Sequence, residues 1–145
     1  MTDLRQRALQ YLTRREYSRA ELYSKLAGQA ESETALESVL DGLETERLLS
    51  DERFARQRVI TRSTRYGDGR LRQDLRQRGV SDADIAAALP EAGDELARCQ
   101  AIWAKKFGCP PVSAEERAKQ LRFLQYRGFS MNTIQQTLRG FEEET

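Results

Sequence analysis

Apolar residues recur along this chain in a pattern that appears three times, at a spacing of 49 residues. The repeated apolar positions are Leu26, Leu75 and Leu124, then Leu36, Ile85 and Ile134, and finally Leu40, Leu89 and Leu138. A serine occupies the same place in each copy, at Ser32, Ser81 and Ser130. Repetition at a period of about 20 to 50 residues is typical of stacked arrays, whose units bury apolar faces against their neighbours. The pattern therefore predicts three units in tandem.

The polar residues next to the apolar stretches predict that each unit contains three helices. Ser18 and Glu21 have the spacing of a capping box, in which the serine oxygen accepts an amide hydrogen and the glutamate reaches back. Further helix starts are expected at Ser32, Ser50, Ser81 and Ser113, and the third unit is expected to start near Asp94. We therefore expect an all-α fold whose units span residues 1–49, 50–93 and 94–145.

Gly79 is predicted to end the second helix of the middle unit. A glycine in the left-handed conformation closes a Schellman cap. In this cap, the residue that follows the glycine contacts the residue four positions before the glycine. Val80 and Leu75 form that pair here. The same triple recurs 49 residues later around Gly128, so we expect the second helices of units two and three to end alike.

The chain has 145 residues, of which 39% are hydrophobic, which suits one domain of about 100 to 200 residues or several small modules. The repeat favours modules. No apolar run approaches the roughly 20 residues that span a bilayer, and no apolar signal core follows the first residues. We expect a monomeric protein of the bacterial cytoplasm that does not enter a membrane.

Residues suited to catalysis or metal binding are scarce. There is no histidine, so acid–base chemistry would fall to carboxylates or lysines, which follow cap and helix-surface patterns here. Cys99 and Cys109 supply neither a disulfide framework nor a four-ligand zinc set. Gly67-Asp68-Gly69 lacks the third glycine of a dinucleotide fingerprint, and no P-loop motif occurs. The sequence therefore predicts a non-enzymatic protein with no catalytic residue, no cofactor and no metal site.

Charge is nearly balanced over the whole chain but segregated along it. The 24 basic and 23 acidic residues leave a net charge of +1. Residues 53–78 carry nine arginines against two aspartates, a net charge of +7, and residues 98–139 carry eight basic against two acidic residues, a net charge of +6. Residues 31–52 carry one arginine against eight acidic residues, a net charge of −7. Two basic segments therefore alternate with acidic ones.

Arginine outnumbers lysine by 20 to 4, and its planar fork binds phosphate or carboxylate through two parallel hydrogen bonds. The candidate residues for contact with a partner or with DNA are Arg58, Arg62, Arg65, Arg70, Arg72, Arg76, Arg78, Lys119, Arg122 and Arg127. The last three follow the cluster on the middle unit by about one repeat, so both clusters should face the same partner. A plainer interpretation places these arginines on solvated helix faces, in ion pairs worth less than about 1 kcal/mol each.

Three aromatic residues, Tyr66, Phe123 and Tyr126, lie beside these arginines in the sequence. Such rings can stack on nucleic-acid bases, but we expect them to be core or half-buried residues. A helix-turn-helix interpretation of residues 71–89 is disfavoured by charge, because the second helix would present Asp82 to the DNA and phosphates repel it. Sequence-specific promoter binding is therefore not expected.

Four stretches of sequence carry a further pattern that covers nearly the whole chain. They run from Glu16 to Leu26, from Leu48 to Ala55, from Tyr66 to Gly79 and from Phe123 to Ser130. In this order they resemble the RecX family of recombination regulators. The resemblance implies three tandem three-helix repeats that form an elongated, curved array.

The resemblance also implies a partner and an activity. Members of the family bind the RecA recombinase in the groove of its filament on DNA and suppress its ATPase, strand-exchange and co-protease activities, which places them in DNA repair, DNA recombination and the SOS response. Two positions depart from the family pattern. The turn at residues 46–48 lacks a glycine, and Ala27 stands where a lysine is common.

We therefore expect a negative regulator of RecA that binds the RecA filament mainly through its second and third units. Binding to bare single-stranded DNA should be weak, salt-sensitive and independent of sequence. Two alternatives stay open at the level of sequence. One is a freestanding single-stranded DNA-binding protein whose arginines follow phosphates, and the other is a helical adaptor whose acidic segments form the binding faces.

Overall fold

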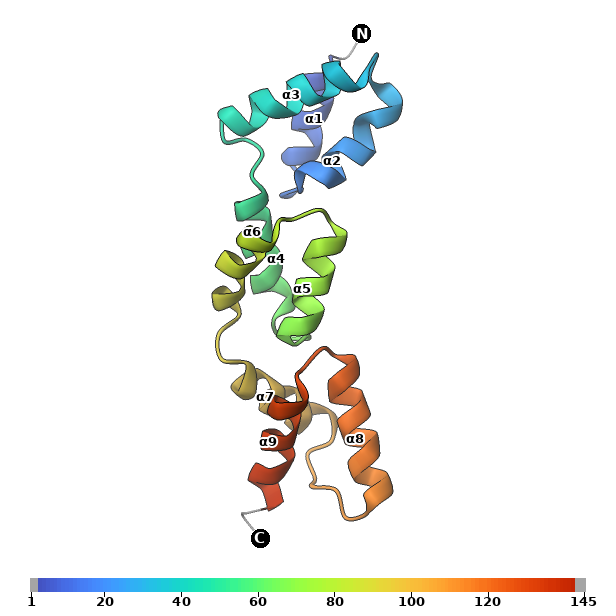
Figure 1. The fold of residues 1–145 in the computed structure, drawn as a ribbon, viewed down its shortest axis with the longest axis vertical. Helices are drawn as coiled ribbons and strands as arrows, with labels where there is room; N and C mark the ends of the chain where they lie inside the picture. The colour runs from blue at the N-terminus through green and yellow to red at the C-terminus, as the bar shows by residue number, and fades with distance from the viewer. Residues whose placement is uncertain (1–2, 143–145) are drawn as a thin grey trace. The chain divides into compact units, whose positions relative to one another are not determined.

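Helices account for most of the chain in the computed structural model, which describes residues 3–142 (Figure 1). The α-helices are α1 (Leu4–Leu12), α2 (Arg19–Leu26), α3 (Glu33–Thr45), α4 (Asp51–Arg62), α5 (Asp68–Gln77), α6 (Asp82–Ala88), α7 (Glu95–Lys106), α8 (Ala114–Tyr126) and α9 (Met131–Glu142). Two short 3-10 helices, η1 (Ala27–Gln29) and η2 (Leu89–Ala92), follow α2 and α6. Within the described residues there is no strand, and no helix is long and apolar enough to cross a bilayer. The prediction of an all-α fold with three groups of three helices is confirmed.

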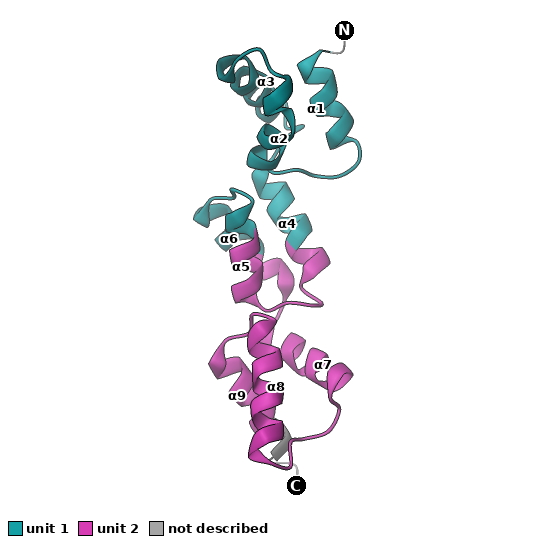
Figure 2. Cartoon of the chain, turned by 90° about the vertical axis from the view of Figure 1, so that its right-hand side faces the viewer, with its two compact units in different colours: residues 1–58, 75–88 teal, residues 59–74, 89–145 magenta. Residues whose placement is uncertain are grey.

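The helices assemble into two compact units that share α4 and α5. The first unit contains residues 1–58 and 75–88, and the second contains residues 59–74 and 89–145. Figure 2 shows that the division falls inside both shared helices, so each of them contributes its two ends to different units. The repeat boundaries expected after residues 49 and 93 stay predictions.

In the first unit, α1, α2 and α3 pack against one another around an apolar core (Figure 1). The buried residues of this core are Ala8, Tyr17, Leu22, Leu26, Leu36, Leu40, Leu43 and Leu49. Leu22 and Leu26 are four residues apart, which places both on one face of α2. Full burial of a leucine side chain contributes roughly 1.5–3 kcal/mol, so this core stabilises the N-terminal helices substantially.

In the second unit, α7, α8 and α9 enclose a separate core. Its buried residues are Cys99, Trp103, Leu124, Phe129, Ile134 and Leu138. The Trp103 indole donates to Gln120 Oε1 at 2.8 Å, and Gln120 Nε2 donates to the carbonyl of Cys109 at 3.1 Å. These bonds tie α7 and the loop after it to α8. Cys99 and Cys109 are both free thiols, and burial raises the pKa of Cys99.

The helices begin at the predicted capping residues. Ser18 Oγ accepts from the Glu21 amide at 3.1 Å, and the Glu21 carboxylate accepts from the Ser18 amide at 3.1 Å, which completes the capping box. At the other expected helix starts, the side chains of Ser32, Ser50, Ser81 and Ser113 accept first-turn amide hydrogens at 3.1 or 3.2 Å. Asp94, near which the third unit was expected to start, caps α7 in the same way at 3.2 Å. Short-range polar patterns therefore located each of these helix starts.

Schellman caps end α5 and α8, as predicted. Gly79 has a φ of 84°, the Val80 amide donates to the carbonyl of Leu75 at 3.1 Å, and the Gly79 amide donates to that of Arg76 at 3.0 Å. Gly128 has a φ of 96°, and the equivalent two bonds are present around it. Both glycines adopt a left-handed conformation that a residue with a Cβ resists.

Two details differ from an ideal repeat. Leu89 is only half-buried and lies in η2, because Pro90 has no amide hydrogen to continue α6. The turn at residues 46–48 adopts the backbone conformation expected of a turn that contains glycine. Arg47 adopts a φ of 61° and the Leu48 amide donates to the carbonyl of Leu43 at 2.9 Å. The missing glycine is therefore replaced by an arginine held in a left-handed conformation, at a cost of about 1–2 kcal/mol.

The end of α8 meets the start of α5 within the second unit, and we call this contact the second junction. The amide of Gly67 donates to the carbonyl of Arg127 at 2.8 Å, and that of Gly69 donates to the carbonyl of Gly128 at 3.1 Å. A Cβ at Gly128 would collide with the Cβ of Arg70, and one at Gly67 would lie 2.6 Å from the Gly128 backbone. Carbonyls at the end of α8 thus accept hydrogen bonds from amides at the start of α5. The two backbones are so close that only glycine fits at Gly67 and Gly128.

The end of α5 meets the start of α2 within the first unit in a corresponding way, and we call this contact the first junction. Ser18 Oγ, already the N-cap of α2, donates to the carbonyl of Arg78 at 2.7 Å. A Cβ at Gly79 would collide with the Cβ of Ala20. The glycine that caps α5 is therefore also the residue that allows close contact between the two helices.

A carboxyl pair lies beside the second junction. Asp68 accepts from Arg98 Nη2 at 2.9 Å, and Glu95 accepts from the amide of Ser130 at 3.2 Å. Burial, followed by the hydrogen bond and charge of Asp68, raises the pKa of Glu95. The interactions of Glu95 thus favour its neutral form in the folded protein.

Replacing Gly79 or Gly128 with valine should lower the free energy of unfolding by more than about 1 kcal/mol, because the side chain both resists a positive φ and collides with Ala20 or Arg70. Gly42 is the matched control. It lies inside α3, and a Cβ added there would have no atom within 4 Å, so Gly42→Ala should raise stability by about 0.5–1 kcal/mol. Urea or thermal unfolding measures all three variants, and unchanged stability in both valine variants would contradict the caps.

Replacing Glu95 with glutamine should change how stability depends on pH. The folded protein retains the Glu95 proton to a higher pH than the unfolded chain does. The contribution of Glu95 to the free energy of unfolding therefore falls as the pH rises from the unfolded pKa of about 4.3 through the raised folded pKa. Glu95→Gln removes that decline and should be more stable than the wild type at neutral pH. Thermal unfolding between about pH 4 and pH 7 tests this, with the exposed Glu91→Gln as control. Parallel pH profiles for the wild type and Glu95→Gln would contradict it.

Candidate functional site

A basic hollow with a volume of about 570 Å³ opens in the second unit between the turn from α4 to α5, the end of α7 and the face of α8. It is lined by Thr64, Arg65, Tyr66, Ile102, Lys105, Lys106, Phe123 and Arg127, and we call it the basic groove. Four of these side chains are cationic, and none is a carboxylate. The groove therefore suits an anionic ligand.

Arg127 is held in the basic groove by aromatic rings. Its guanidinium lies 5.1 Å from the ring centre of Phe123 and 5.6 Å from that of Tyr66, and Nη1 donates to the carbonyl of Arg65 at 3.4 Å. Lys106 lies 5.4 Å from the Phe123 ring. Each such contact contributes about 0.5–1 kcal/mol at an exposed site. The rings thus position the cations and leave hydrogen-bond donors for a ligand.

Arg70 lies at the edge of the same cluster. Its guanidinium is 5.0 Å from the ring centre of Tyr66 and 5.1 Å from that of Tyr126, and Nη1 donates to the carbonyl of Tyr126 at 2.9 Å. Two arginines therefore approach the Tyr66 ring, Arg70 from α5 and Arg127 from the residue that follows α8. The structure brings together three of the predicted contact residues: Arg65, Arg70 and Arg127.

The aromatic residues divide into two classes. Tyr66 and Phe123 are half-buried, as expected from the sequence. The expectation was wrong for Tyr126, whose exposed fraction is 72%. Leu124, two positions earlier on α8, is fully buried, and a helix turns by about 200° over two residues, so Tyr126 faces solvent.

Arg78 has a structural environment in the first junction. Its guanidinium forms an ion pair with Glu21, and its carbonyl accepts from Ser18. Burial alone would raise the pKa of Glu21, but the hydrogen bond from the Ser18 amide and the guanidinium groups of Arg15 and Arg78 lower it to below its usual value. Glu21 therefore stays ionised and neutralises Arg78.

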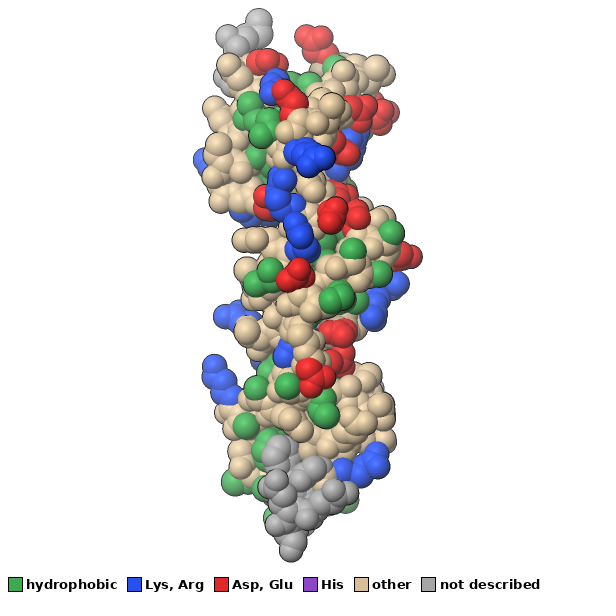
Figure 3. Space-filling model, turned by 90° about the vertical axis from the view of Figure 1, so that its left-hand side faces the viewer, with side chains coloured by type: hydrophobic (Ala, Val, Ile, Leu, Met, Phe, Trp, Pro, Cys, Tyr) green, Lys and Arg blue, Asp and Glu red, His purple; other side chains and the backbone are tan. Residues whose placement is uncertain are grey.

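The other predicted residues lie outside the basic groove. Arg76 forms an exposed ion pair with Asp82 at 3.1 Å, which is worth less than about 1 kcal/mol. The half-buried members are Arg58, Arg62 and Arg72, and the exposed ones are Lys119 and Arg122. On the face drawn in Figure 3, acidic side chains lie among basic ones. Two arginines outside the predicted set are also paired, Arg19 with Asp41 and Arg53 with Glu16.

Lys105 and Lys106 line the basic groove but were not among the predicted contact residues. They belong to the basic segment 98–139 and occupy the last turn of α7, where a cation also complements the helix dipole. Charge alone could have nominated them. Only the folded arrangement places them opposite Arg65 and Arg127.

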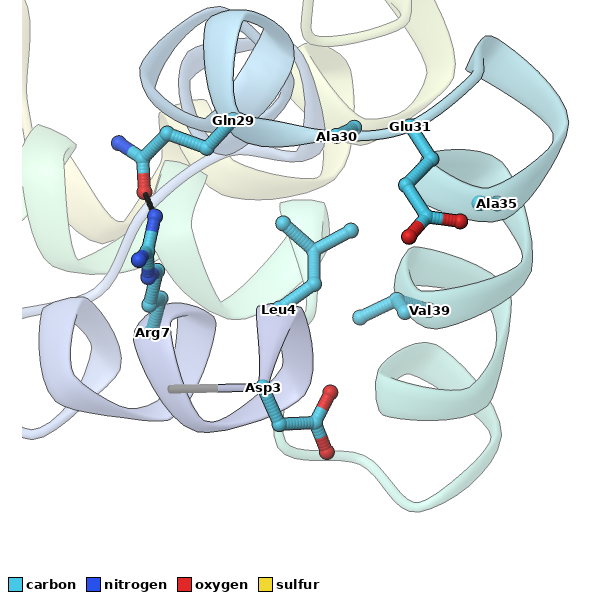
Figure 4. Close-up of a pocket in the computed structure, with 8 residues that line it drawn as sticks. All are labelled: Asp3, Leu4, Arg7, Gln29, Ala30, Glu31, Ala35 and Val39. Atoms are coloured by element: carbon cyan, nitrogen blue, oxygen red, sulfur yellow. Dashed lines mark hydrogen bonds between the residues drawn. The ribbon is translucent and has the colours of Figure 1, made fainter. Parts of the chain in front are cut away.

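A second hollow, of about 440 Å³, lies between α1, η1 and α3 in the first unit (Figure 4). Leu4 and Val39 form its apolar wall, while the carboxylates of Asp3 and Glu31 lie at its rim. The Arg7 guanidinium donates to Gln29 Oε1. Its mixed lining gives no set of converging like charges, in contrast to the basic groove.

Family models match the chain in three consecutive segments. The first three-helix domain of RecX matches residues 5–43, the second matches residues 50–89, and the third matches residues 93–138. The three domains follow one another in the same order as the three groups of helices.

Relatives match over nearly the full chain. It is 46% identical over 141 residues to the regulatory protein RecX of Ralstonia nicotianae, covering 95% of this chain and 87% of the relative. It is 46% identical over 138 residues to the regulatory protein RecX of Chromobacterium violaceum, covering 95% and 90%. The crystal structure of RecX from Lactobacillus salivarius has the same fold, with a TM-score of 0.84 at 20% identity over 97% of this chain and 95% of that one. By sequence, domain order and fold, the chain belongs to the RecX family of regulatory proteins.

Proposed function

We propose that this protein is a negative regulator of RecA that binds the RecA filament on DNA and lowers its ATPase, strand-exchange and co-protease activities. The observation that supports this most directly is the match of all three RecX domains, in order, along one chain. The site of action would be the bacterial cytoplasm, where a monomer of this protein meets RecA assembled on single-stranded DNA.

The distribution of charge supports a contact through the second and third repeats. Their basic segments, residues 53–78 and 98–139, have net charges of +7 and +6, whereas residues 31–52 carry −7. A protein filament on DNA presents both phosphates and acidic side chains, and arginine binds either through paired hydrogen bonds. The first repeat would then face away from the anionic partner, or contact a basic surface of it.

A physical mechanism for inhibition follows from the repeat architecture. An array of small, individually packed helical modules can bind more than one neighbouring protomer along a helical filament. Nucleotide turnover requires protomers to move relative to one another, so a ligand that binds one arrangement more tightly opposes that movement. No catalytic group is needed for this effect.

A second candidate function is nonspecific binding of single-stranded DNA, which the basic groove favours. A third is a helical adaptor that binds through the acidic segment. Binding measured separately with bare DNA, with RecA alone and with the assembled filament distinguishes the three. The proposed regulator should bind the assembled filament more tightly than it binds bare DNA or RecA alone. The DNA-binding protein should bind bare DNA as tightly as the filament. For the adaptor, lowering the salt concentration should not increase the affinity for bare DNA or for the filament.

Reversing exposed charges on the basic segments should weaken inhibition of the DNA-dependent ATPase of RecA. A variant with Arg65, Lys119 and Arg122 each changed to glutamate alters three exposed side chains, so the fold should be retained. Loss of about 1.4 kcal/mol of binding energy would raise the concentration needed for half-inhibition about tenfold. The measurement is ATP hydrolysis by preassembled filaments titrated with each folded variant.

The control reverses two exposed acidic residues on α3, Glu33→Lys and Glu37→Lys, and should leave inhibition nearly unchanged. Equal inhibition by the wild type and by the triple glutamate variant would exclude this surface. No inhibition by the wild type would exclude the proposed function itself.

A further inference from the structure

The two junctions are related by the 49-residue repeat, so their side chains can be compared position by position. The equivalent pairs are Glu16 and Arg65, Tyr17 and Tyr66, Glu21 and Arg70, Arg53 and Ile102, and Arg78 and Arg127. The tyrosine and the last arginine are kept in both copies. Both glutamates of the first junction are replaced by arginines in the second.

The first junction neutralises its own charges. Glu16 forms an ion pair with Arg53 at 2.5 Å, and Glu21 forms one with Arg78. The tyrosine of this junction, Tyr17, is buried, with an exposed fraction of 7%. Glu16 and Glu21 each pair with an arginine of the same unit, so these two carboxylates are explained by folding alone.

The second junction lacks those partners. Arg65 and Arg70 occupy the positions of the two glutamates, and Ile102 occupies that of the arginine that pairs with one of them. The nearest acid along the chain, Asp68, already accepts from Arg98. Arg127 therefore faces rings, a carbonyl and further cations where its counterpart Arg78 faces a carboxylate. Like charges gathered at one junction repel one another, and an anion that binds there relieves this repulsion.

The rings at the second junction indicate the chemical class of the anion. Tyr126 is exposed at its edge, and the guanidinium of Arg70 lies over its ring. Exposed aromatic rings beside cations are the elements with which proteins bind single-stranded nucleic acid, because bases stack on rings while arginine and lysine contact the backbone. The carboxylates of an acidic peptide would contact the cations but would not stack on the ring as the face of a base does.

We propose that the second junction and the basic groove form a binding site for single-stranded nucleic acid, in which Arg65, Lys106 and Arg127 contact phosphates and a base stacks on Tyr126. This deepens the proposed function, since it assigns the DNA contact of the regulator to one junction. The site takes the strand without regard to base sequence, because its contacts are to phosphates and to the face of a base. The first junction does not share the activity.

The test is binding of a fluorescently labelled oligothymidylate to the full-length protein, followed by anisotropy across a series of salt concentrations without RecA. Arg65 and Lys106 are exposed, so Arg65→Gln with Lys106→Gln should leave the fold intact. The logarithm of the affinity falls with that of the salt concentration with a slope of about −0.7 per neutralised phosphate, so this variant should flatten the slope by about 1.4 and weaken binding about tenfold at low salt. The matched control, Arg56→Gln with Arg139→Gln, removes two exposed charges elsewhere and should change affinity by less than about twofold.

The ring is tested separately. Tyr126→Ser should weaken binding about fivefold to tenfold without changing the salt slope, whereas Tyr126→Phe should retain the affinity. Equal losses in the groove variant and the control variant would show general charge attraction and overturn the site, and unchanged binding by Tyr126→Ser would overturn the stacking contact. Stronger competition by polyglutamate than by unlabelled oligothymidylate would assign the site to an acidic peptide instead. The binding assay contains no RecA, so its result is independent of the ATPase assay. If the protein inhibits RecA but does not bind the strand, this site alone is overturned. If it binds the strand but does not inhibit RecA, the proposed regulation alone is overturned.

Discussion

Close contact between helix ends is the constraint on which the rest of the structure depends. Gly128 closes α8 with a positive φ and at the same time lies against Gly67 and Arg70 at the start of α5. Carbonyls at the end of α8 that have no partner within the helix accept hydrogen bonds from the amides at the start of α5. Neither set of backbone groups is therefore buried without a partner. Gly79 combines the same two roles against Ala20 at the first junction. A glycine thus ends each of the helices α5 and α8, and the same glycine allows close contact with a helix of the preceding repeat.

The same contact determines which charges are available for binding. In the first junction, Glu21 and Arg78 neutralise each other, and their ion pair supports the contact of α5 with α2. In the second, the backbone bonds and the Tyr66 ring support the contact, so Arg70 and Arg127 do not depend on a carboxylate. A duplicated structural device can therefore serve folding in one copy and ligand binding in another, because the backbone contact is common to both while the side chains differ.

Most of the fold was predictable because its signals are local. The side chains of Ser18, Ser32 and Asp94 cap helices through bonds to residues no more than three positions away, and the glycine caps depend on six consecutive residues. The two departures from the regular repeat are local as well. Helix α6 ends at Ala88, before Pro90, which shortens one helix, and the left-handed Arg47 shows that the turn does not require the missing glycine.

The sequence by itself determined the helical repeat, its caps and the segregation of charge, since each of these is a property of neighbouring residues or of periodicity along the chain. Only the tertiary structure decided which arginines are neutralised and which converge. Arg78 and Arg127 are equivalent in the repeat, yet one meets Glu21 from a helix 57 residues away and the other meets rings. Tyr126 likewise faces solvent because of how α8 packs. Partners brought together by folding are distant in sequence, so charge and spacing alone could not assign them.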